Sequence, residues 1–365
     1  MEVIKILHIA SESLTLKKKI TGIKSILLEE IKYINKCSRV DAKLYGISKK
    51  LEENSDLCIN NVSLDKDIIN YNPTFVIFHG FYIFKHVLIA KFLKKNNIKY
   101  YIKPHGGFNK AAQEKAYFKK KIARILYFDK FVKNSSGIIY LNEYEKSKSI
   151  YHKKFEIILP NGLSKKHTEI KPQIFTNKYI KFIYFGRIEI QAKGLDILLE
   201  SIVANKDYFF KNNIIFKFYG NGRKKDINYL KRIVKNNSNV IKYYGPVYDN
   251  KQKYSILQEN DINILLSKYE GMPMSILEGL SVGLPCFISE ETGLQELIEA
   301  CKCGWIKSRD RDIFYDLQLC IKDYIEKKTQ YRLNALKVSK KFIWEKLIYK
   351  YYENYLHISI KGDKL

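Results

Sequence analysis

Two glutamates lie eight residues apart around an expected helix start, and their carboxylates could bind sugar hydroxyls. Glu270 follows the apolar run 261–266, which has the pattern of a buried strand. Pro273 suits the first position of a helix expected at about 273–282, because proline lacks the N–H that would be unpaired there. Glu278 lies farther along this helix. Carboxylates accept hydrogen bonds from paired hydroxyls, and a helix N-terminus attracts anions, so this segment could hold a nucleotide-sugar.

A second candidate site carries two cations between glycines, where a strand is expected to end and a helix to begin. Gly186 and Arg187 follow the apolar run 180–185, and Lys193 precedes Gly194. Arginine can bind two phosphate oxygens at once, lysine adds a point charge, and glycine lets the backbone approach closely. Basic loop residues are usually only solvated, so this junction indicates a diphosphate site mainly through its combination with the two glutamates.

Two further strand ends could face a nucleotide. Gly220 begins a Gly-Asn-Gly turn after the run 214–219, but the third glycine of a dinucleotide fingerprint is missing. A plain turn and a nucleotide-facing loop therefore both remain open. Val247 follows another expected strand end, where its backbone could contact the edge of a base.

The first half of the chain offers a histidine at a glycine-rich turn. His105 lies within Lys103-Pro-His-Gly-Gly107, directly after an expected strand, and His79 ends an earlier one. Histidine titrates near neutral pH and can donate to a developing negative charge. Most single histidines are structural, but the place of His105 at the carboxyl end of a strand favours function. Gly22 opens the first long helix after the loop 11–21, so its N–H could face an anion.

These sites lie on a regular alternation of strands and helices, which predicts an α/β fold with parallel sheets covered on both faces. Strands are expected at 4–10, 40–45, 75–79, 98–103, 137–141, 156–159, 180–185, 214–219, 240–244, 262–266 and 286–289. Helices are expected at 22–36, 83–96, 110–133, 142–151, 194–205, 225–235, 248–258, 273–282 and 293–300, with more after 308. The rhythm pauses over a polar linker at 164–178. We therefore expect an N-terminal domain at 1–165, a C-terminal domain at 166–340 and a last helical segment at 341–365.

The composition excludes a disordered chain, since 46% of the 365 residues are hydrophobic and 28% are charged. Six scattered cysteines indicate free thiols in a reducing compartment rather than a zinc site. No apolar run approaches the ~20 residues that cross a bilayer. We therefore expect a cytoplasmic protein without a bound metal.

The net charge of +27 is concentrated in one region: residues 81–135 carry fourteen Lys and Arg against two acids. In the helix expected at 110–133, Phe118, Ile122 and Leu126 recur on one face among lysines. Three interpretations remain open. This helix could pack by its apolar stripe, bind anionic lipid or bind nucleic acid. Nucleic acid is disfavoured because no known reading module is visible.

The assembled motifs resemble those of retaining glycosyltransferase family 4, which has the GT-B fold: two doubly wound Rossmann-like domains facing across a cleft. The matching marks are Phe185-Gly-Arg187 with Lys193-Gly194, the E-x7-E pair Glu270/Glu278, Pro104-His-Gly106, Pro160-Asn-Gly162 and Phe342-Ile-Trp344. The resemblance is strongest over about 181–296. Family members often carry a glycine pair before the first helix, where this chain has Ile20-Thr-Gly22-Ile23.

The resemblance implies a role for each matching residue. Arg187 and Lys193 would bind the donor diphosphate, Glu270 the transferred sugar and Glu278 the ribose diol, while His105 would lie beside the reacting sugar. Gly271, Met272 and Pro273 would shape the sugar pocket, and Ser275 and Ile276 would offer N–H groups to phosphate. The last helix would cross back to the N-terminal domain. No metal or other cofactor is implied.

The resulting hypothesis is a retaining hexosyltransferase that uses a UDP- or GDP-sugar donor and a glycan or polyprenyl-linked acceptor. Such enzymes build capsule, lipopolysaccharide or other bacterial surface polysaccharide, which would place this one peripherally at the inner face of the cell membrane. Two alternatives are a non-hydrolysing sugar-nucleotide epimerase on a similar fold and a basic protein that binds membranes or nucleic acid without catalysis.

Overall fold

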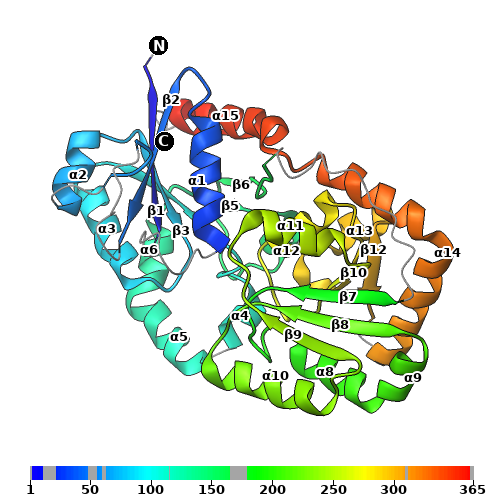
Figure 1. The fold of residues 1–365 in the computed structure, drawn as a ribbon. Helices are drawn as coiled ribbons and strands as arrows, with labels where there is room; N and C mark the ends of the chain where they lie inside the picture. The colour runs from blue at the N-terminus through cyan, green and yellow to red at the C-terminus, as the bar shows by residue number, and fades with distance from the viewer. Residues whose placement is uncertain are drawn as a thin grey trace. The chain divides into compact units, whose positions relative to one another are not determined.

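The computed structural model describes residues 2–10, 22–47, 56–59, 63–114, 116–164, 179–308 and 311–361 (Figure 1). The loop predicted at 11–21 and nearly all of the linker predicted at 164–178 lie outside these residues. The chain divides into two compact units. The N-terminal unit comprises Met1–Gly162 with Trp344–Leu365, and the C-terminal unit comprises Leu163–Ile343. The last helix thus clusters with the first part of the chain.

The N-terminal unit is built on a six-stranded parallel sheet with the strand order β2-β1-β3-β4-β5-β6. Its strands are β1 Ile4–Ala10, β2 Val40–Gly46, β3 Phe75–His79, β4 Lys99–Lys103, β5 Gly137–Tyr140 and β6 Glu156–Ile158. The central strands are apolar runs with both faces buried, as expected when helices cover both faces of a parallel sheet. The register sets Ala10 beside His79, and His79 beside Lys103, so three adjacent strands end together.

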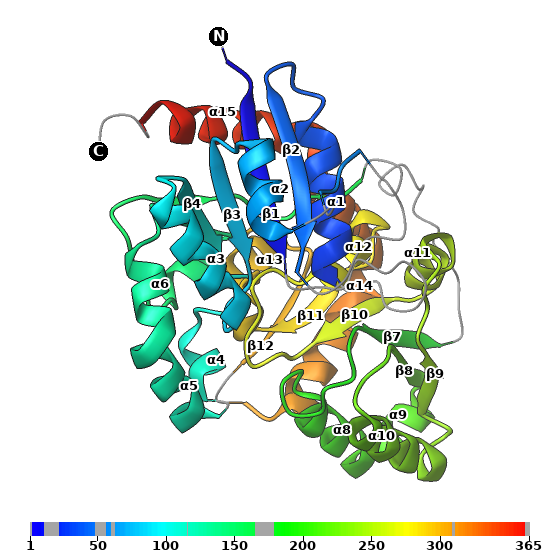
Figure 2. The same cartoon turned by 90° about the vertical axis from the view of Figure 1, so that its left-hand side faces the viewer.

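Helices lie on both sides of this sheet (Figures 1 and 2). They are α1 Gly22–Ile34, α2 Leu64–Tyr71, α3 Phe84–Lys95, α4 Lys110–Glu114, α5 Tyr117–Ala123, the π-helix η1 Arg124–Phe128, α6 Asp129–Lys133, α7 Glu143–Ser147 and α15 Trp344–Lys361. Helix α15 packs against α1, and its buried Tyr351 and Tyr355 face the sheet core.

The C-terminal unit repeats the architecture, with the strand order β12-β11-β10-β7-β8-β9. Its strands are β7 Ile180–Phe185, β8 Ile214–Tyr219, β9 Ile241–Gly245, β10 Ile262–Leu265, β11 Cys286–Ser289 and β12 Gly304–Lys307. Its helices are α8 Leu195–Ala204, α9 Lys206–Lys211, α10 Lys224–Asn236, α11 Asn250–Gln258, α12 Met274–Ser281, the short η3 Glu290–Thr292, α13 Gln295–Cys301 and α14 Ile313–Ser339.

The structure confirms every predicted strand to within one residue at each end, because most of them are short, mainly apolar runs bounded by polar residues or glycine. The sequence analysis missed α2, α9 and β12. Helix α9 follows α8 after only Asn205, so its charged pattern merged with the preceding helix. Strand β12 has only four residues, Gly-Trp-Ile-Lys, so its apolar run is two residues long and too short to recognise in the sequence.

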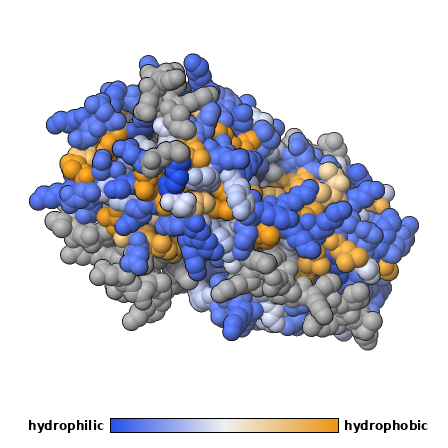
Figure 3. Space-filling view, turned by 90° about the horizontal axis from the view of Figure 1, so that it is seen from above, coloured by the Kyte–Doolittle hydropathy of each residue, from blue (hydrophilic) through white to orange (hydrophobic). Residues whose placement is uncertain are grey.

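The single helix predicted at 110–133 is wrong. Ala116 has a left-handed backbone, φ 59°, which ends α4 and starts α5, and the helix then widens into η1. The interpretation that Phe118, Ile122 and Leu126 pack this helix onto the protein is also wrong, since all three side chains are exposed. On the face drawn in Figure 3, hydrophilic side chains predominate and smaller hydrophobic areas lie between them.

Candidate active site

In the C-terminal unit, the fold brings together Lys193 and Glu270, which are 77 residues apart in sequence. The Lys193 Nζ lies 2.5 Å from Glu270 Oε1, and the Ser267 hydroxyl donates to the same oxygen at 2.7 Å. Both charged side chains are largely buried. A cation and a carboxylate that share one site can contact a phosphate and a sugar hydroxyl of the same ligand. Ser267 was missed, because a serine after a strand carries no distinctive sequence signal.

Close backbone packing holds this pair in place. Gly194 has φ 62°, and a Cβ on it would lie 2.0 Å from the Leu266 carbonyl oxygen. The Lys268 N–H donates to the Ala192 carbonyl at 3.0 Å, which joins the loop before α8 to the loop after β10. Any side chain at position 194 would push these loops apart. The glycine after Lys193 is therefore explained by packing.

Arg187 is not joined to the Lys193–Glu270 pair. Its side chain is exposed, and its Nη1 lies 3.4 Å from Glu189 Oε1. The buried Tyr184 hydroxyl donates to the Arg187 carbonyl at 2.6 Å, which fixes the backbone and leaves the guanidinium extended. The predicted diphosphate contact of Arg187 stays a prediction.

Glu278, on α12, forms an ion pair that the sequence did not reveal. Its Oε1 lies 2.6 Å from the Nζ of Lys253 on α11, and both side chains are largely buried. Lys253 resembles any other helical lysine in the sequence, and only the packing of α11 beside α12 identifies it. The pair orients the carboxylate that was predicted to bind a ribose diol.

The start of α12 differs from the prediction. Pro273 is the N-cap, with ψ 111°, and the helix spans Met274–Ser281 rather than 273–282. The Ile276 N–H donates to the Pro273 carbonyl at 3.2 Å, so Ser275 is the stronger of the two predicted phosphate donors. Asn263 on β10 donates to the Ser275 carbonyl at 2.8 Å and thereby fixes this turn.

Most of the glycine and apolar residues that were predicted to contact the donor make contacts within the protein instead. The Gly220 N–H donates to the Gly245 carbonyl, and its own carbonyl accepts from the Tyr243 hydroxyl. A Cβ on Gly220, which has φ 144°, would lie 1.7 Å from the Gly186 carbonyl oxygen, so packing explains this glycine. The Val247 side chain packs against the core of the C-terminal unit. Gly271 and Met272 are buried beside Glu270, and Gly22 is the first residue of α1.

In the N-terminal unit, His105 occupies a strained turn after β4. Its backbone has φ 50° and that of Gly106 has φ 82°. A non-glycine residue in the left-handed region costs free energy that the surrounding structure must offset, and such residues cluster at functional sites. Glu145, at the start of α7, holds the turn from outside, because its buried carboxylate accepts from the N–H groups of Gly106 and Leu141. Glu145 had no distinctive signal in the sequence.

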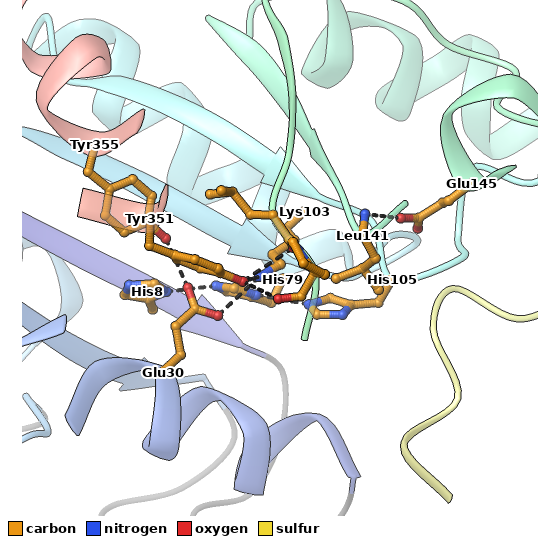
Figure 4. Close-up of polar contacts among 11 residues, drawn as sticks. His8, Glu30, His79, Lys103, His105, Leu141, Glu145, Tyr351 and Tyr355 are labelled. Carbon is orange, nitrogen blue, oxygen red and sulfur yellow. Dashed lines mark hydrogen bonds and ion pairs between the residues drawn. The ribbon is translucent and has the colours of Figure 1, made fainter. Parts of the chain in front are cut away.

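His105 is the outer member of a row of three imidazoles, which we call the histidine row: His8 on β1, His79 on β3 and His105 (Figure 4). His8 Nδ1 lies 2.9 Å from His79 Nε2, and His79 Nδ1 lies 3.0 Å from His105 Nε2. Burial lowers the pKa of His105 to about 3 and that of His8 to about 4. The expectation that His105 titrates near neutral pH is therefore wrong, although a neutral imidazole still has one N–H to donate.

A buried ion pair lies beside this row. Lys103, the last residue of β4, forms a 3.0 Å ion pair with Glu30 on α1. The Lys103 Nζ also donates to the Tyr351 hydroxyl at 3.0 Å, and the Tyr355 hydroxyl donates to Glu30 at 2.9 Å (Figure 4). Burial pushes the pKa of the Glu30 carboxyl upward, but Lys103 and the other neighbours together hold it below its usual value. Helix α15 therefore completes a polar network inside the N-terminal unit.

Comparisons with known proteins agree with this architecture. Residues 165–338, which lie within the C-terminal unit, match the model of the family Glycosyl transferases group 1. An Escherichia coli enzyme, UDP-Gal:alpha-D-GlcNAc-diphosphoundecaprenol alpha-1,3-galactosyltransferase, is 27% identical over 180 residues. The match covers 46% of this chain and 45% of that enzyme, which is less than half of the enzyme's length.

Solved structures match nearly the whole chain. Sucrose-phosphate synthase from Thermosynechococcus elongatus has a TM-score of 0.75 at 12% identity, covering 97% of this chain and 99% of that one. HepE from Anabaena, in complex with UDP and glucose, has a TM-score of 0.70 at 15% identity, covering 96% and 99%. At such identities the likeness establishes the fold alone, and the α/β fold predicted from the sequence is confirmed as GT-B.

Proposed function

We propose that this protein is a retaining glycosyltransferase that moves a hexose-type sugar from a nucleotide-diphosphate donor to a glycan or lipid-linked acceptor in bacterial surface polysaccharide synthesis. The contact between Lys193 and Glu270 carries the proposal. Within a Glycosyl transferases group 1 domain, this contact sets a phosphate-binding cation beside a hydroxyl-binding carboxylate, as a sugar diphosphate requires.

The proposed division of labour follows the charges. Lys193 neutralises the donor diphosphate, with Arg187 supplying a second cation and Ser275 an N–H at the start of α12. Glu270 orients the transferred sugar through its hydroxyls, and Glu278, oriented by Lys253, binds the ribose diol. As negative charge develops on the leaving diphosphate, a preorganised cation stabilises the transition state more than the ground state. In the retaining mechanism we propose, the leaving phosphate takes the proton of the acceptor hydroxyl.

The donor and acceptor classes are proposed from the relatives. The Escherichia coli relative is named for a UDP-sugar donor and an undecaprenol-linked acceptor, and HepE was solved with UDP and with UDP-glucose. A UDP-sugar is therefore the first donor to test, followed by a GDP-sugar. A polyprenyl diphosphate that carries a sugar is the first acceptor to test.

A lipid acceptor requires a membrane, and the N-terminal unit carries a surface suited to one. We call it the α5–η1 surface; its apolar members are Tyr117 (50% exposed), Phe118 (78%), Ile122 (60%), Ile125 (65%) and Leu126 (60%). Lys119, Lys121 and Lys130 are exposed around them. Large apolar side chains grouped on a solvent-exposed surface indicate an interaction site, and the surrounding lysines favour anionic lipid over neutral partners.

From this surface we propose that the protein lies peripherally at the inner face of the cell membrane. Within the described ranges, no helix is both long and apolar enough to span a bilayer. The α5–η1 surface would therefore provide attachment by lying on the membrane, with apolar tips among the acyl chains and lysines at the headgroups.

Titration calorimetry with UDP, GDP, a DNA duplex and anionic vesicles tests the function, followed by product analysis with UDP-sugars. We expect one nucleotide to bind tightly and sugar to appear on a polyprenyl-linked acceptor. If the protein binds DNA or vesicles but binds neither UDP nor GDP, the proposal is contradicted. An isomerised sugar-nucleotide formed without acceptor would indicate the epimerase instead.

A further inference from the structure

The histidine row has a geometry that couples the protonation of its two ends. His8, His79 and His105 come from β1, β3 and the turn after β4, three neighbouring positions in one sheet. His8 is 0% exposed and His79 is 2% exposed, while His105 is partly exposed at the outer end. The His8 and His79 rings are nearly parallel, with 20° between their planes and 5.1 Å between their centroids. Each contact joins two ring nitrogens, so each needs one proton between them (Figure 4).

All three rings are neutral at neutral pH. Burial is the main cause, and it lowers the pKa of His79 well below its usual value, as it lowers those of its two neighbours. The charged groups facing the row are Lys103, which lowers the pKa values further, and Glu30, which opposes it at His8 and His105. A neutral imidazole has one N–H and one lone pair.

One N–H per ring and one proton per contact leave two arrangements. In the first, His8 donates from Nδ1, His79 donates from Nδ1, and the outward Nδ1 of His105 carries a hydrogen. In the second, every ring is protonated on Nε2, both hydrogen bonds run the other way, and the outward Nδ1 of His105 is a bare lone pair. The inner nitrogen of His8 thus determines whether His105 presents a donor or an acceptor.

The inner nitrogen decides between these arrangements. His8 Nε2 is buried and has no hydrogen-bond partner among the described residues. The second arrangement would leave an N–H at this nitrogen without an acceptor, and orphaned buried N–H groups are rarer than under-satisfied acceptors. The first arrangement leaves only a lone pair there. It also lets all three N–H groups donate, two within the row and one outward.

We propose that His8 and His79 are positioning residues that hold His105 as its Nδ1–H tautomer, so that the row presents a hydrogen-bond donor at its outer end. In the proposed glycosyltransferase, this N–H donates a hydrogen bond to an oxygen of the sugar-nucleotide. Only this choice of hydrogen-bond partner rests on the proposed function. His8 Nε2 has no described partner with which to exchange a proton, so the row directs a hydrogen bond and passes no proton through.

Nitrogen NMR of the histidine side chains in the ligand-free protein tests this directly, with the His105 signal assigned by its loss in His105→Gln. We expect His105 in the wild-type protein to be neutral and protonated on Nδ1 at pH 7. A free histidine side chain prefers the Nε2–H tautomer. Finding His105 protonated on Nε2 in the wild-type protein would therefore overturn the inference by itself.

Two variants then test the roles of His79 and His8. His79→Phe keeps a buried ring but removes both contacts, and His8→Leu changes only the far end of the row. We expect His105 to shift toward the Nε2–H tautomer in the first and to become a mixture in the second. His86→Leu is the matched control, because His86 is also buried in this unit but is not hydrogen-bonded to the row. A His105 signal unchanged in folded His8→Leu protein would contradict the coupling.

Kinetics separate this inference from the proposed function. If both hold, His79→Phe lowers kcat/KM for the donor about tenfold, the effect of one lost hydrogen bond. An active transferase with His105 protonated on Nε2 would overturn the inference alone. A protein with the expected tautomer that transfers no sugar would overturn the function alone.

Discussion

The two candidate sites use opposite physical means. The histidine row of the N-terminal unit consists of neutral rings, and its specificity lies in the direction of its hydrogen bonds. The Lys193–Glu270 site of the C-terminal unit consists of an ion pair whose side chains are largely buried but keep some exposure. A fixed direction of hydrogen bonds requires a rigid, buried scaffold, whereas the attraction between charges acts over longer distances and tolerates some exposure. Substitutions at the N-terminal site should therefore change mainly the stability of the fold, and those at the C-terminal site mainly the electrostatic stabilisation of the reaction.

The scaffolds differ accordingly. The row lies beside the Lys103–Glu30 pair, and the carboxylate of Glu145 holds its outer turn. The Lys193–Glu270 contact is supported by backbone packing at Gly194 and by one serine hydroxyl. Perturbing each site should separate losses of stability from losses of transfer.

Replacing Lys103 should have the largest effect, and that effect should be on stability. Lys103→Met leaves the Glu30 carboxylate buried without its cation, which typically costs about 3–5 kcal/mol. Urea denaturation measures the free energy of unfolding. The double variant Lys103→Met/Glu30→Leu removes both charges and should recover much of the loss. If Lys103→Met alone unfolds at the wild-type urea concentration, the pair does not stabilise the N-terminal unit.

Replacing Lys193 should leave folding intact and reduce transfer. Lys193→Ala removes the cation from the proposed diphosphate site, and loss of one preorganised electrostatic group costs about 3 kcal/mol in transition-state stabilisation, a hundredfold or more in kcat. Initial rates with a UDP-sugar donor measure this. Lys211→Ala removes an exposed lysine of the same unit and should have no effect. Full turnover by Lys193→Ala would remove Lys193 from the proposed machinery.

Much of the fold could be predicted from the sequence, but the two sites could be predicted to different extents. Strands such as β3 and β7 are short apolar runs whose boundaries are visible locally. Lys193 and Glu270 could be proposed because each belongs to a spaced motif. Their contact, and the partners Ser267 and Lys253, depend on which loops the fold brings together.

The histidine row was hidden for the same reason. His8, His79 and His105 lie on three separate segments, and only the parallel register of β1, β3 and β4 aligns their side chains. Burial then changes their chemistry, so the ordinary pKa of histidine was the wrong guide at His105. Composition and periodicity contain no information on such desolvation.

The turn that carries His105 gives a pH-dependent prediction. Burial raises the pKa of Glu145 from 4.5 to about 7, although two backbone N–H groups oppose the shift. Between these pH values the native state holds a proton that the unfolded state has lost, so the stabilisation is present below about 4.5 and is lost as pH rises to 7. The shift corresponds to at most roughly 3 kcal/mol.

Comparison with Glu145→Gln isolates this effect, since glutamine does not titrate. The free energy of unfolding of the wild-type protein, minus that of the variant, should fall from pH 4.5 to 7 and then level off. Thermal or urea unfolding across that range measures it. A difference independent of pH would show that Glu145 does not hold a proton in the native state.

The smallest expected effect concerns the α5–η1 surface, where the sequence showed the stripe but not its exposure. Phe118→Ser/Ile122→Ser should weaken binding to phosphatidylglycerol vesicles by about 1 kcal/mol or more per side chain, and leave unfolding unchanged because both residues are exposed. Co-sedimentation measures the binding. Ile69→Ser replaces an exposed isoleucine on α2 and is the matched control.

Because lysines and apolar tips act together, wild-type binding should weaken with salt or with neutral phosphatidylcholine, but less completely than purely electrostatic binding would. Equal binding of both vesicle types, or a concentration-dependent dimer that the same substitutions abolish, would assign this surface to another partner.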